Sequence, residues 1–454
     1  SAASDVYKRQ LEYGTVKTGA ETVPMMPNPR ARRQGEDALM DGRRIDRYRG
    51  GIFGLAVDAG TTAIVVHLVD LETGRLSCVS SYENPQKYSG NSVIHRIAYE
   101  NREPGKLQKS IVAHLNRAVK NLSVPPEQIY ETVVSGNPTM RDLFFKLDVR
   151  SLGVRPFQSI VEMEYRAGKR TTTELSARPA DLGVNINPEG SMYGLPVISC
   201  HVGADTAAGL VAIGMKNKTT PVFFLDIGTN SEVALGCRDR IMAASCAAGP
   251  AFEGGGVKYG MPAFKGAIEH LEFVEDRFIC QVIDGGEARG ICGSGLVDAI
   301  AEMKRHGLMD EEGRLKGGSS EIPLVQDGSI TLSREDLSHL AQAKAAILAG
   351  QKILLEHYGI RLEEVDTFYL AGGFAHALDI EKAKEIGLLL PLPSEKFVKA
   401  GNTSILGAQE ALLSVRRREE MARLAGKVEH VELERDPKFF DLFVEGLMWT
   451  PAVF

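Results

Sequence analysis

A short motif occurs twice in this chain, and its two copies constrain the fold more than any other feature. In the first copy, an apolar run ends in Asp58, and the turn AGTT connects it to a β-branched run. In the second copy, the run VFFLD ends in Asp226, and the turn IGTN connects it to another extended run. A hairpin signal and another extended run follow each copy, so each predicts a three-stranded antiparallel opening. The two aspartates lie 168 residues apart, which is a domain-sized repeat and predicts two homologous α/β lobes.

Helices are expected on the faces of both sheets. Apolar residues recur at helical spacing in four segments, residues 106–122, 205–213, 290–305 and 337–355. We therefore expect an α/β protein with one lobe over residues 51–215 and a second over residues 216–454. Residues 1–50 are interpreted as the remnant of a truncated upstream region. Residues 1–10 are adapter-like, artefactual sequence, and residues 11–50 are a linker or an extended edge and not part of a core.

Composition narrows the classes of partner. The chain has 454 residues, and 53 Lys and Arg against 59 Asp and Glu leave a net charge of −6. No basic stripe results, which argues against nucleic-acid binding and favours small molecules or proteins. No apolar run approaches the ~18 residues of a membrane span, so no membrane association is expected. Six cysteines without a CxxC pair fit free thiols in a reducing cytoplasm.

Each copy of the motif places a carboxylate at a strand end beside a glycine and hydroxyl groups. One such turn is what turn chemistry alone would select, but two facing turns can hold a nucleotide. A carboxylate near phosphate requires a cation, so Asp58 and Asp226 are predicted to hold Mg²⁺ through water. The residues predicted to contact the phosphates are Gly60, Thr61, Thr62, Gly228, Thr229 and Asn230.

Three further segments are candidates for nucleotide contacts. The apolar strand in FYLAGGFA ends in Gly372 and Gly373, whose bare backbone offers a surface for adenine and ribose. Glu253, in PAFEGGG, is predicted to reach the phosphates, although a solvated side chain on a flexible loop fits equally. Gly293 and Ser294 open a helix and offer N–H groups to an anion, or form a plain glycine-rich helix entry.

The two turns and the adenosine turn, DAGTT, DIGTN and LAGGFA, resemble the superfamily of actin, sugar kinases and heat-shock-protein ATPases, the ASKHA proteins. The resemblance implies two RNase H-like lobes with a nucleotide cleft between them, and ATP with Mg²⁺ as ligands. Longer strings resemble the reductive activators of corrinoid proteins, and the similarity extends over residues 52–454. These strings are NPQKYSGNSVIHRI, SGNPTM, HVGADTAAG, SCAAGPAFEGGG, GICGSGLVDAI and KAGNTSILGA.

The narrower resemblance implies ATP-dependent reduction of a corrinoid protein from Co(II) to Co(I), for a methyltransferase system. It also implies an electron donor protein, since activators of this kind work with an iron–sulfur domain. A [2Fe–2S] or [4Fe–4S] cluster needs about four clustered cysteines. The first cysteine here is Cys78, so the cluster is expected in a missing upstream region or in a separate donor.

Two other readings stay open. Cys200 and Cys246 resemble the cysteine neighbourhoods of 2-hydroxyacyl-CoA dehydratase activators, which share one [4Fe–4S] cluster across a homodimer; as an alternative, both are small buried residues. In a sugar-type kinase, Asp205 would be the catalytic base. It equally fits a helix N-cap or a carboxylate that orients water, and we place it with Asp58 and Asp226 in the predicted catalytic set. Whether the chain forms a homodimer is left open.

Overall fold

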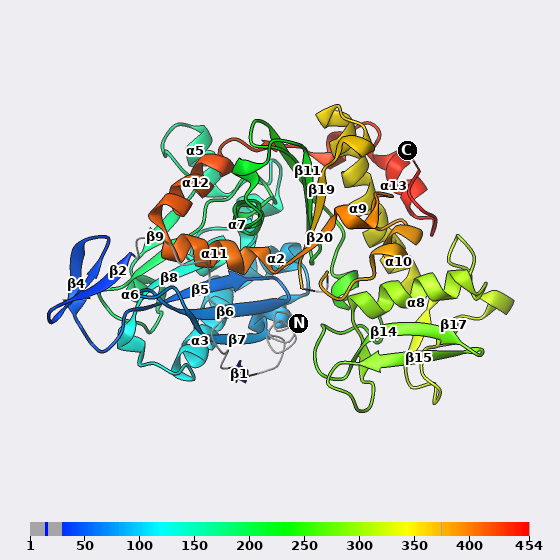
Figure 1. Ribbon diagram of the computed structural model, residues 1–454, viewed down its shortest axis with the longest axis horizontal. Helices are drawn as coiled ribbons and strands as arrows, with labels where there is room; N and C mark the ends of the chain where they lie inside the picture. Colours follow the sequence, from blue (N-terminus) through cyan, green and yellow to red (C-terminus); the bar gives the residue numbers. More distant parts are fainter. Residues whose placement is uncertain (1–13, 17–29, 374, 454) are drawn as a thin grey trace. The chain divides into compact units, whose positions relative to one another are not determined.

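The computed structural model describes residues 14–16, 30–373 and 375–453, which divide into two compact units (Figure 1). The first unit comprises Ser1–Met215 and Asn402–Val428, and the second comprises Lys216–Gly401 and Glu429–Phe454. A single boundary at residue 216 does not describe this organisation, because the chain returns to the first unit at Asn402. The interpretation of residues 1–10 as adapter sequence lies outside the described residues.

The first unit is built on a seven-stranded sheet with the strand order β1-β7-β6-β5-β8-β10-β9. Strands β5, β6 and β7 pair antiparallel, as the motif predicts, and β5 also pairs in parallel with β8. The seven strands are β1 (Gly14–Val16), β5 (Phe53–Ala59), β6 (Ala63–Asp70), β7 (Leu76–Glu83), β8 (Ile129–Ser135), β9 (Leu175–Ala177) and β10 (Ser191–Gly194). Every residue of β8 is buried, because β8 lies inside the sheet between β5 and β10.

Helices pack on this sheet through the apolar faces that the sequence pattern indicates. Ile111, Leu115 and Val119 of α3 are buried in the core, and α11 packs along β5, β8 and α7 (Figure 1). A Cβ atom on Gly407 of α11 would overlap the backbone of Ala208, so glycine lets α11 and α7 approach closely. The helices are α2 (Val93–Arg102), α3 (Lys106–Lys120), α4 (Pro138–Phe144), α5 (Ile160–Arg166), α6 (Pro179–Leu182), α7 (Ala204–Ala212), α11 (Thr403–Leu413) and α12 (Val415–Ala425).

The second unit repeats the same opening on a six-stranded sheet with the order β20-β19-β11-β12-β13-β21. Strands β11, β12 and β13 pair antiparallel, and β19 lies parallel beside β11. These strands are β11 (Val222–Asp226), β12 (Ser231–Gly236), β13 (Ile241–Cys246), β19 (Thr367–Ala371), β20 (Phe397–Gly401) and β21 (Glu429–His430). The repeat predicted from the two motifs is therefore present in both sheets.

Smaller sheets and four helices complete the second unit. Strands β15, β14 and β16 form one sheet and β17 and β18 another, and α8 packs on β14. The bounds are β14 (Ala267–Val274), β15 (Arg277–Val282), β16 (Gly290–Ile291), β17 (Glu321–Pro323), β18 (Thr331–Ser333), α8 (Gly293–Arg305), α9 (Arg334–Tyr358), α10 (Ile380–Glu385) and α13 (Phe439–Gly446). Within the described ranges, no helix combines the length and apolar character that crossing a bilayer requires.

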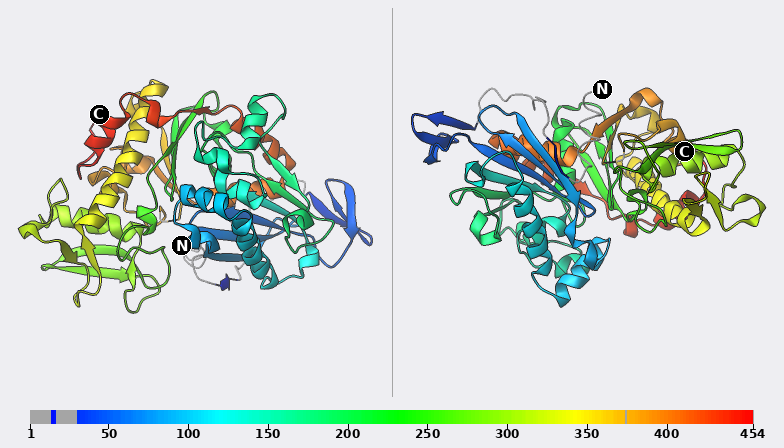
Figure 2. Two further views of the ribbon diagram at one scale, coloured as in Figure 1. Left: turned by 180° about the vertical axis from the view of Figure 1, so that it is seen from behind. Right: turned by 90° about the horizontal axis from the view of Figure 1, so that it is seen from below.

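Residues 31–47 form an ordered antiparallel meander where the sequence predicts a linker. Its strands are β2 (Ala31–Gln34), β3 (Asp37–Met40) and β4 (Arg43–Arg47), and Figure 2 shows them at the edge of the first unit. Asp41 and Gly42 adopt φ values of 51° and 76°, which suit a tight Asp-Gly hairpin. Arg30 joins the meander to the sheet through an ion pair with buried Glu131 at 2.7 Å. The strands escape sequence detection because few of their residues are apolar.

Candidate functional site

The first turn, residues 59–62, connects β5 to β6, and Asp58 lies just before it. The Asp58 carboxylate accepts hydrogen bonds from Asn402 Nδ2 and from Ser404 Oγ, both at 2.8 Å. Burial raises the pKa of Asp58, whereas the hydrogen bonds from Asn402 and Ser404 lower it. Because both donors are neutral, they orient the carboxylate without cancelling its charge, which suits a ligand of a hydrated cation.

Asp205 lies in the same unit, in the first turn of α7. The N-cap of this helix is Gly203 rather than Asp205, so the capping role considered from the sequence does not apply. Burial raises the pKa of Asp205 to about 7; the backbone N–H of Thr206 opposes this shift, and the charge of Asp58 adds to it. A carboxylate with a pKa near neutrality is suited to accept a proton from water.

The loop after β8 packs against the first turn. Gly136 has a φ of 147°, and a Cβ atom there would lie 2.8 Å from the carbonyl oxygen of Ala59. The next residue, Asn137, donates from Nδ2 to Thr61 Oγ1 at 2.9 Å. Ser135 Oγ lies 2.9 Å from the Ser404 hydroxyl that binds Asp58. This loop therefore contacts both the turn and the residues that hold its aspartate.

Sequence reasoning did not single out several of these polar residues. Asn402 and Ser404 lie in KAGNTSILGA, and Ser135 and Asn137 lie in SGNPTM, two of the strings that carry the family resemblance. Their positions in those strings could have identified these residues as candidates for the site. What the strings do not reveal is that Asn402, 344 residues beyond Asp58 in sequence, binds that aspartate.

The second turn, residues 227–230, follows β11 and lies against the glycine turn after β19. Asp226 is in register with Ala371 of the parallel strand β19. Gly372 has a φ of 98°, and a Cβ atom there would overlap the Ile227 carbonyl oxygen and lie 2.9 Å from Asp226 Oδ1. Only glycine fits this contact, so the structure brings Asp226 and Gly372 together. Gly373 is exposed, and α10 begins only at Ile380.

Glu253 faces the second turn. It ends a short 3-10 helix, η5 (Ala251–Glu253), and its carboxylate forms a hydrogen bond with the Thr229 hydroxyl. Glu253 Oε1 would lie 3.8 Å from a Cβ atom placed on Gly228, so its side chain lies beside the turn backbone. Asn230, at the end of the turn, is partly exposed. The structure thus groups Asp226, Glu253 and residues 228–230.

Gly293 and Ser294 open α8 as the sequence predicts, but they are buried. The Ser294 hydroxyl donates to the Glu269 carbonyl at 2.9 Å, which ties the start of α8 to β14. This contact fits a packing role for the glycine-rich helix entry. An anion contact at Gly293 and Ser294 therefore remains a prediction.

None of the six cysteines, all of which the structure describes, forms a disulfide, and five of them are buried. Cys246 is 1% exposed in the second unit, and burial raises the pKa of its thiol. Cys200, in the first unit, donates its backbone N–H to Glu162 at 2.8 Å. Among the described residues, no group of three or more His, Cys, Asp or Glu side chains is placed to hold a metal.

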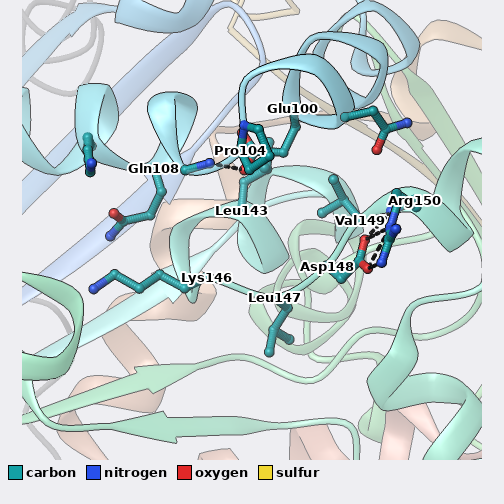
Figure 3. A pocket seen from close by; sticks show the side chains of 12 residues that line it. Glu100, Pro104, Gln108, Leu143, Lys146, Leu147, Asp148, Val149 and Arg150 are labelled. Carbon is teal, nitrogen blue, oxygen red and sulfur yellow. Dashed lines mark hydrogen bonds and ion pairs between the residues drawn. The ribbon is translucent and has the colours of Figure 1, made fainter.

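A pocket of about 510 Å³ opens in the first unit, between α2, the start of α3 and the segment after α4 (Figure 3). Lys109 and Lys146 line it, together with Arg150, which forms an ion pair with Asp148. None of the predicted site residues lines this pocket. It is therefore separate from the candidate nucleotide-binding turns.

Each of the two α/β units carries an aspartate at the end of a strand, β5 or β11, and a glycine turn beside it. This arrangement defines an ASKHA-type ATPase with the actin-like fold. A family model described as the C-terminal domain of RACo, the ASKHA domain, matches residues 220–452, and a model of the RACo middle region matches residues 53–218. The chain belongs to the RACo family of reductive activators of corrinoid proteins.

Individual relatives agree with this assignment. The corrinoid activation enzyme RamQ of Eubacterium limosum is 32% identical over 433 residues, which cover 88% of this chain and 71% of RamQ. The [Co(II) methylated amine-specific corrinoid protein] reductase of Methanosarcina barkeri is 26% identical over 439 residues, 88% of this chain and 78% of the reductase. A solved reductive activator for corrinoid, iron-sulfur protein superposes with a TM-score of 0.82 at 33% identity, over 91% of this chain and 70% of that one. The resemblance stated from the sequence motifs is confirmed.

Proposed function

We propose that this chain uses Mg·ATP to drive the reductive activation of a corrinoid protein, from Co(II) to Co(I), for a corrinoid-dependent methyltransferase system. Family membership supports the reaction, because one relative is named a corrinoid activation enzyme and another a reductase of a Co(II) corrinoid protein. The observation that carries the ATPase step is the pairing of Asp58, oriented by two neutral donors, with Asp205, whose pKa is about 7.

The described residues fit Mg·ATP as a ligand. The oriented carboxylate of Asp58 and the glycine turn that a Cβ atom would fill at Gly372 are the features expected for a hydrated cation and a nucleotide. When bound, Mg²⁺ compensates the phosphate charge, and ATP supplies free energy on hydrolysis. Asp58 and Asp226 hold the water shell of the cation, the turn residues 60–62 and 228–230 bind phosphate oxygens, and Gly372 and Gly373 bind the adenosine.

Asp205 acts as the general base in this proposal. Its carboxylate orients the attacking water and accepts a proton from it, and burial, with the nearby charge of Asp58, keeps its pKa high enough to hold that proton. Glu253 fixes the Thr229 hydroxyl, so that the second turn presents one defined conformation.

Coupling to ATP is required on energetic grounds. Moving one electron uphill costs ~2.3 kcal/mol per 100 mV, so a donor a few hundred millivolts too weak needs free energy of nucleotide scale. We assign electron delivery to a [2Fe–2S] or [4Fe–4S] group outside residues 30–453, in an upstream region of a longer protein or in a separate donor protein. Six free cysteines favour a reducing cytoplasm as the place of this reaction.

The test is to measure ATP turnover by the purified chain with and without a Co(II) corrinoid protein. We expect slow turnover that rises when the corrinoid protein is added, because partner binding completes the active arrangement. With a chemical reductant present, Co(I) absorbance should develop only when ATP is supplied. No response to the corrinoid protein, together with stimulation by a sugar or an organic acid, would assign the chain to the sugar-type kinases instead.

A further inference from the structure

The first turn is held from one side by two buried residues to which the proposed chemistry gives no role. The side-chain amide of Asn84 donates to the carbonyl of Gly60 at 2.7 Å, and its backbone N–H donates to the carbonyl of Thr62 at 2.8 Å. The guanidinium of Arg96 donates to the carbonyl between them, that of Thr61. Three consecutive carbonyl groups of the turn are therefore fixed by Asn84 and Arg96.

These contacts also fix the direction of the N–H groups of the turn. In a trans peptide the C=O and N–H groups point in opposite directions. The carbonyls of Gly60 and Thr61 point toward Asn84 and Arg96, so the N–H groups of Thr61 and Thr62 point to the opposite side of the turn. Successive N–H groups directed to one side of a turn form a concavity suited to an anion.

Asn84 and Arg96 are themselves fixed by their surroundings. Asn84 is 0% exposed and Arg96 is 1% exposed. Asn84 Oδ1 accepts from the backbone N–H of Gln86 at 2.9 Å, which sets the orientation of the amide, and Arg96 donates to Gln86 Oε1 at 3.3 Å. Gln86 in turn donates to the Leu107 carbonyl at 3.1 Å. A network of buried side chains of this kind holds one conformation and can position a backbone segment precisely enough to bind a ligand.

We propose that Asn84 and Arg96 are positioning residues for nucleotide binding: they hold the carbonyls of the first turn from behind and thereby direct its N–H groups toward the phosphate chain of Mg·ATP. This inference rests on the proposed function, since it takes a nucleoside triphosphate as the ligand of the turn. It also gives a physical role to the string NPQKYSGNSVIHRI, which begins with Asn84 and contains Arg96.

Two variants and two matched controls test the proposal. Asn84→Ala removes the amide donor, and Arg96→Lys keeps the charge but loses the planar, multiply donating group. Asn187 and Arg141 are equally buried in the first unit and hold carbonyls away from the turn, Asn187 at 2.7 Å and Arg141 at 2.8 and 3.0 Å. Asn187→Ala and Arg141→Lys therefore report the cost of losing a comparable buried network elsewhere.

Calorimetric titrations with Mg·ATP and with adenosine separate positioning from general damage. We expect Asn84→Ala and Arg96→Lys each to weaken Mg·ATP binding about tenfold and to leave adenosine binding within about twofold of the unmodified protein. Adenosine has no phosphates and so does not depend on the first turn. Both control variants should bind Mg·ATP within about twofold of the unmodified protein, although all four substitutions lower the melting temperature.

The outcomes distinguish this proposal from the proposed function. If the unmodified protein binds Mg·ATP and the two test variants bind it as well as their controls, or lose adenosine binding equally, Asn84 and Arg96 are only structural. If the unmodified protein binds no Mg·ATP, the proposed function itself fails.

A second measurement needs no variant and so does not depend on a substituted chain folding. Hydrogen–deuterium exchange of the unmodified protein should slow in the peptide containing Thr61 and Thr62 when a non-hydrolysable ATP analogue and Mg²⁺ are added. Unchanged exchange there, under conditions where calorimetry shows the analogue bound, would overturn the proposal.

Discussion

The two turns share a backbone plan but differ in the charge of the side chains around them. Asp58 is held by the neutral groups of Asn402 and Ser404, and the first turn is backed by the guanidinium of Arg96. At the second turn, the Thr229 hydroxyl binds the carboxylate of Glu253. The groups that hold the first turn and its aspartate are therefore hydrogen-bond donors, whereas the group that holds the Thr229 hydroxyl of the second turn is a carboxylate.

The two copies of the motif therefore share their backbone geometry but differ in the chemistry of the side chains around them. Each lobe places an aspartate at a strand end before a glycine turn, because that geometry exposes backbone groups. The backbone N–H groups of the first turn suit phosphate oxygens directly, whereas Asp58 and the two carboxylates at the second turn tolerate phosphate only with a cation between them. The following predictions test this division of roles.

The largest effect is expected from Asp205→Asn in the first unit. If Asp205 is the base, ATP turnover should fall by about 10²–10⁴-fold while Mg·ATP affinity stays within about threefold. In the unmodified protein, turnover should rise with pH around the pKa of about 7, because only the ionised carboxylate accepts a proton. Steady-state rates between pH 5.5 and 8.5 check both points. A variant that keeps the same pH profile would remove Asp205 from the base role.

The raised pKa of Asp205 also predicts that the stability of the protein falls with pH, whereas its turnover rises. The folded-state pKa of Asp205 lies above its unfolded value of ~3.9, so the folded state binds more protons and its stability falls as pH rises from about 4 to about 7. Asp205→Asn should therefore be more stable than the unmodified protein at pH 8, on the order of 4 kcal/mol, and similar to it at pH 4. Urea denaturation at the two pH values measures the difference.

Removal of divalent cations should have the next largest effect, because it exposes the carboxylates of both turns to phosphate. Loss of ~3 kcal/mol of charge compensation corresponds to about a hundredfold weaker binding of ATP. Calorimetry with excess chelator measures this loss, and adenosine, which has no phosphates, is the control ligand whose affinity should not change. Equal ATP affinity with and without chelator would refute the role of Asp58 and Asp226 as cation ligands.

A smaller effect is expected at the glycine turn beside the second copy of the motif. Gly372→Ala introduces a Cβ atom against Ile227 and Asp226 at a φ of 98°, whereas Gly359→Ala meets nothing within 4 Å at a φ of 81°. Both substitutions carry the left-handed backbone cost of ~1–2 kcal/mol, but only Gly372→Ala also displaces the second turn. We expect both substitutions to lower the melting temperature, Gly372→Ala by more, and about tenfold weaker adenosine binding for Gly372→Ala alone. Normal adenosine binding by Gly372→Ala would place the adenosine site elsewhere.

Much of each lobe is predictable from sequence because the relevant patterns are local. Alternating and β-branched runs identify β5–β7 and β11–β13, and the apolar spacing of residues 106–122 identifies α3. The partners of Asp58 are not predictable in this way. Asn402 binds Asp58 only because the chain leaves the second unit at Gly401 and begins α11 in the first, and no local pattern encodes that return. Glu253 and Thr229 were predicted separately, but their contact depends on the fold of residues 247–253.

The smallest effect concerns Cys200 and Cys246, one in each unit, which a different function would require as cluster ligands. A dehydratase-type activator requires Cys200 and Cys246 as cluster ligands, whereas both are buried and Cys246 is 1% exposed with a thiol whose pKa is raised by burial. We expect Cys246→Ala to lower the free energy of unfolding by ~1 kcal/mol or less. Cys78→Ala should have the same effect, because Cys78 is also buried, and it lies outside the two segments that resemble the dehydratase activators. Anaerobic reconstitution with iron and sulfide should leave both variants and the unmodified chain without a stoichiometric cluster. A visible absorbance at one cluster per two chains, lost in Cys200→Ala and in Cys246→Ala but kept in Cys78→Ala, would instead assign the chain the chemistry of the dehydratase activators.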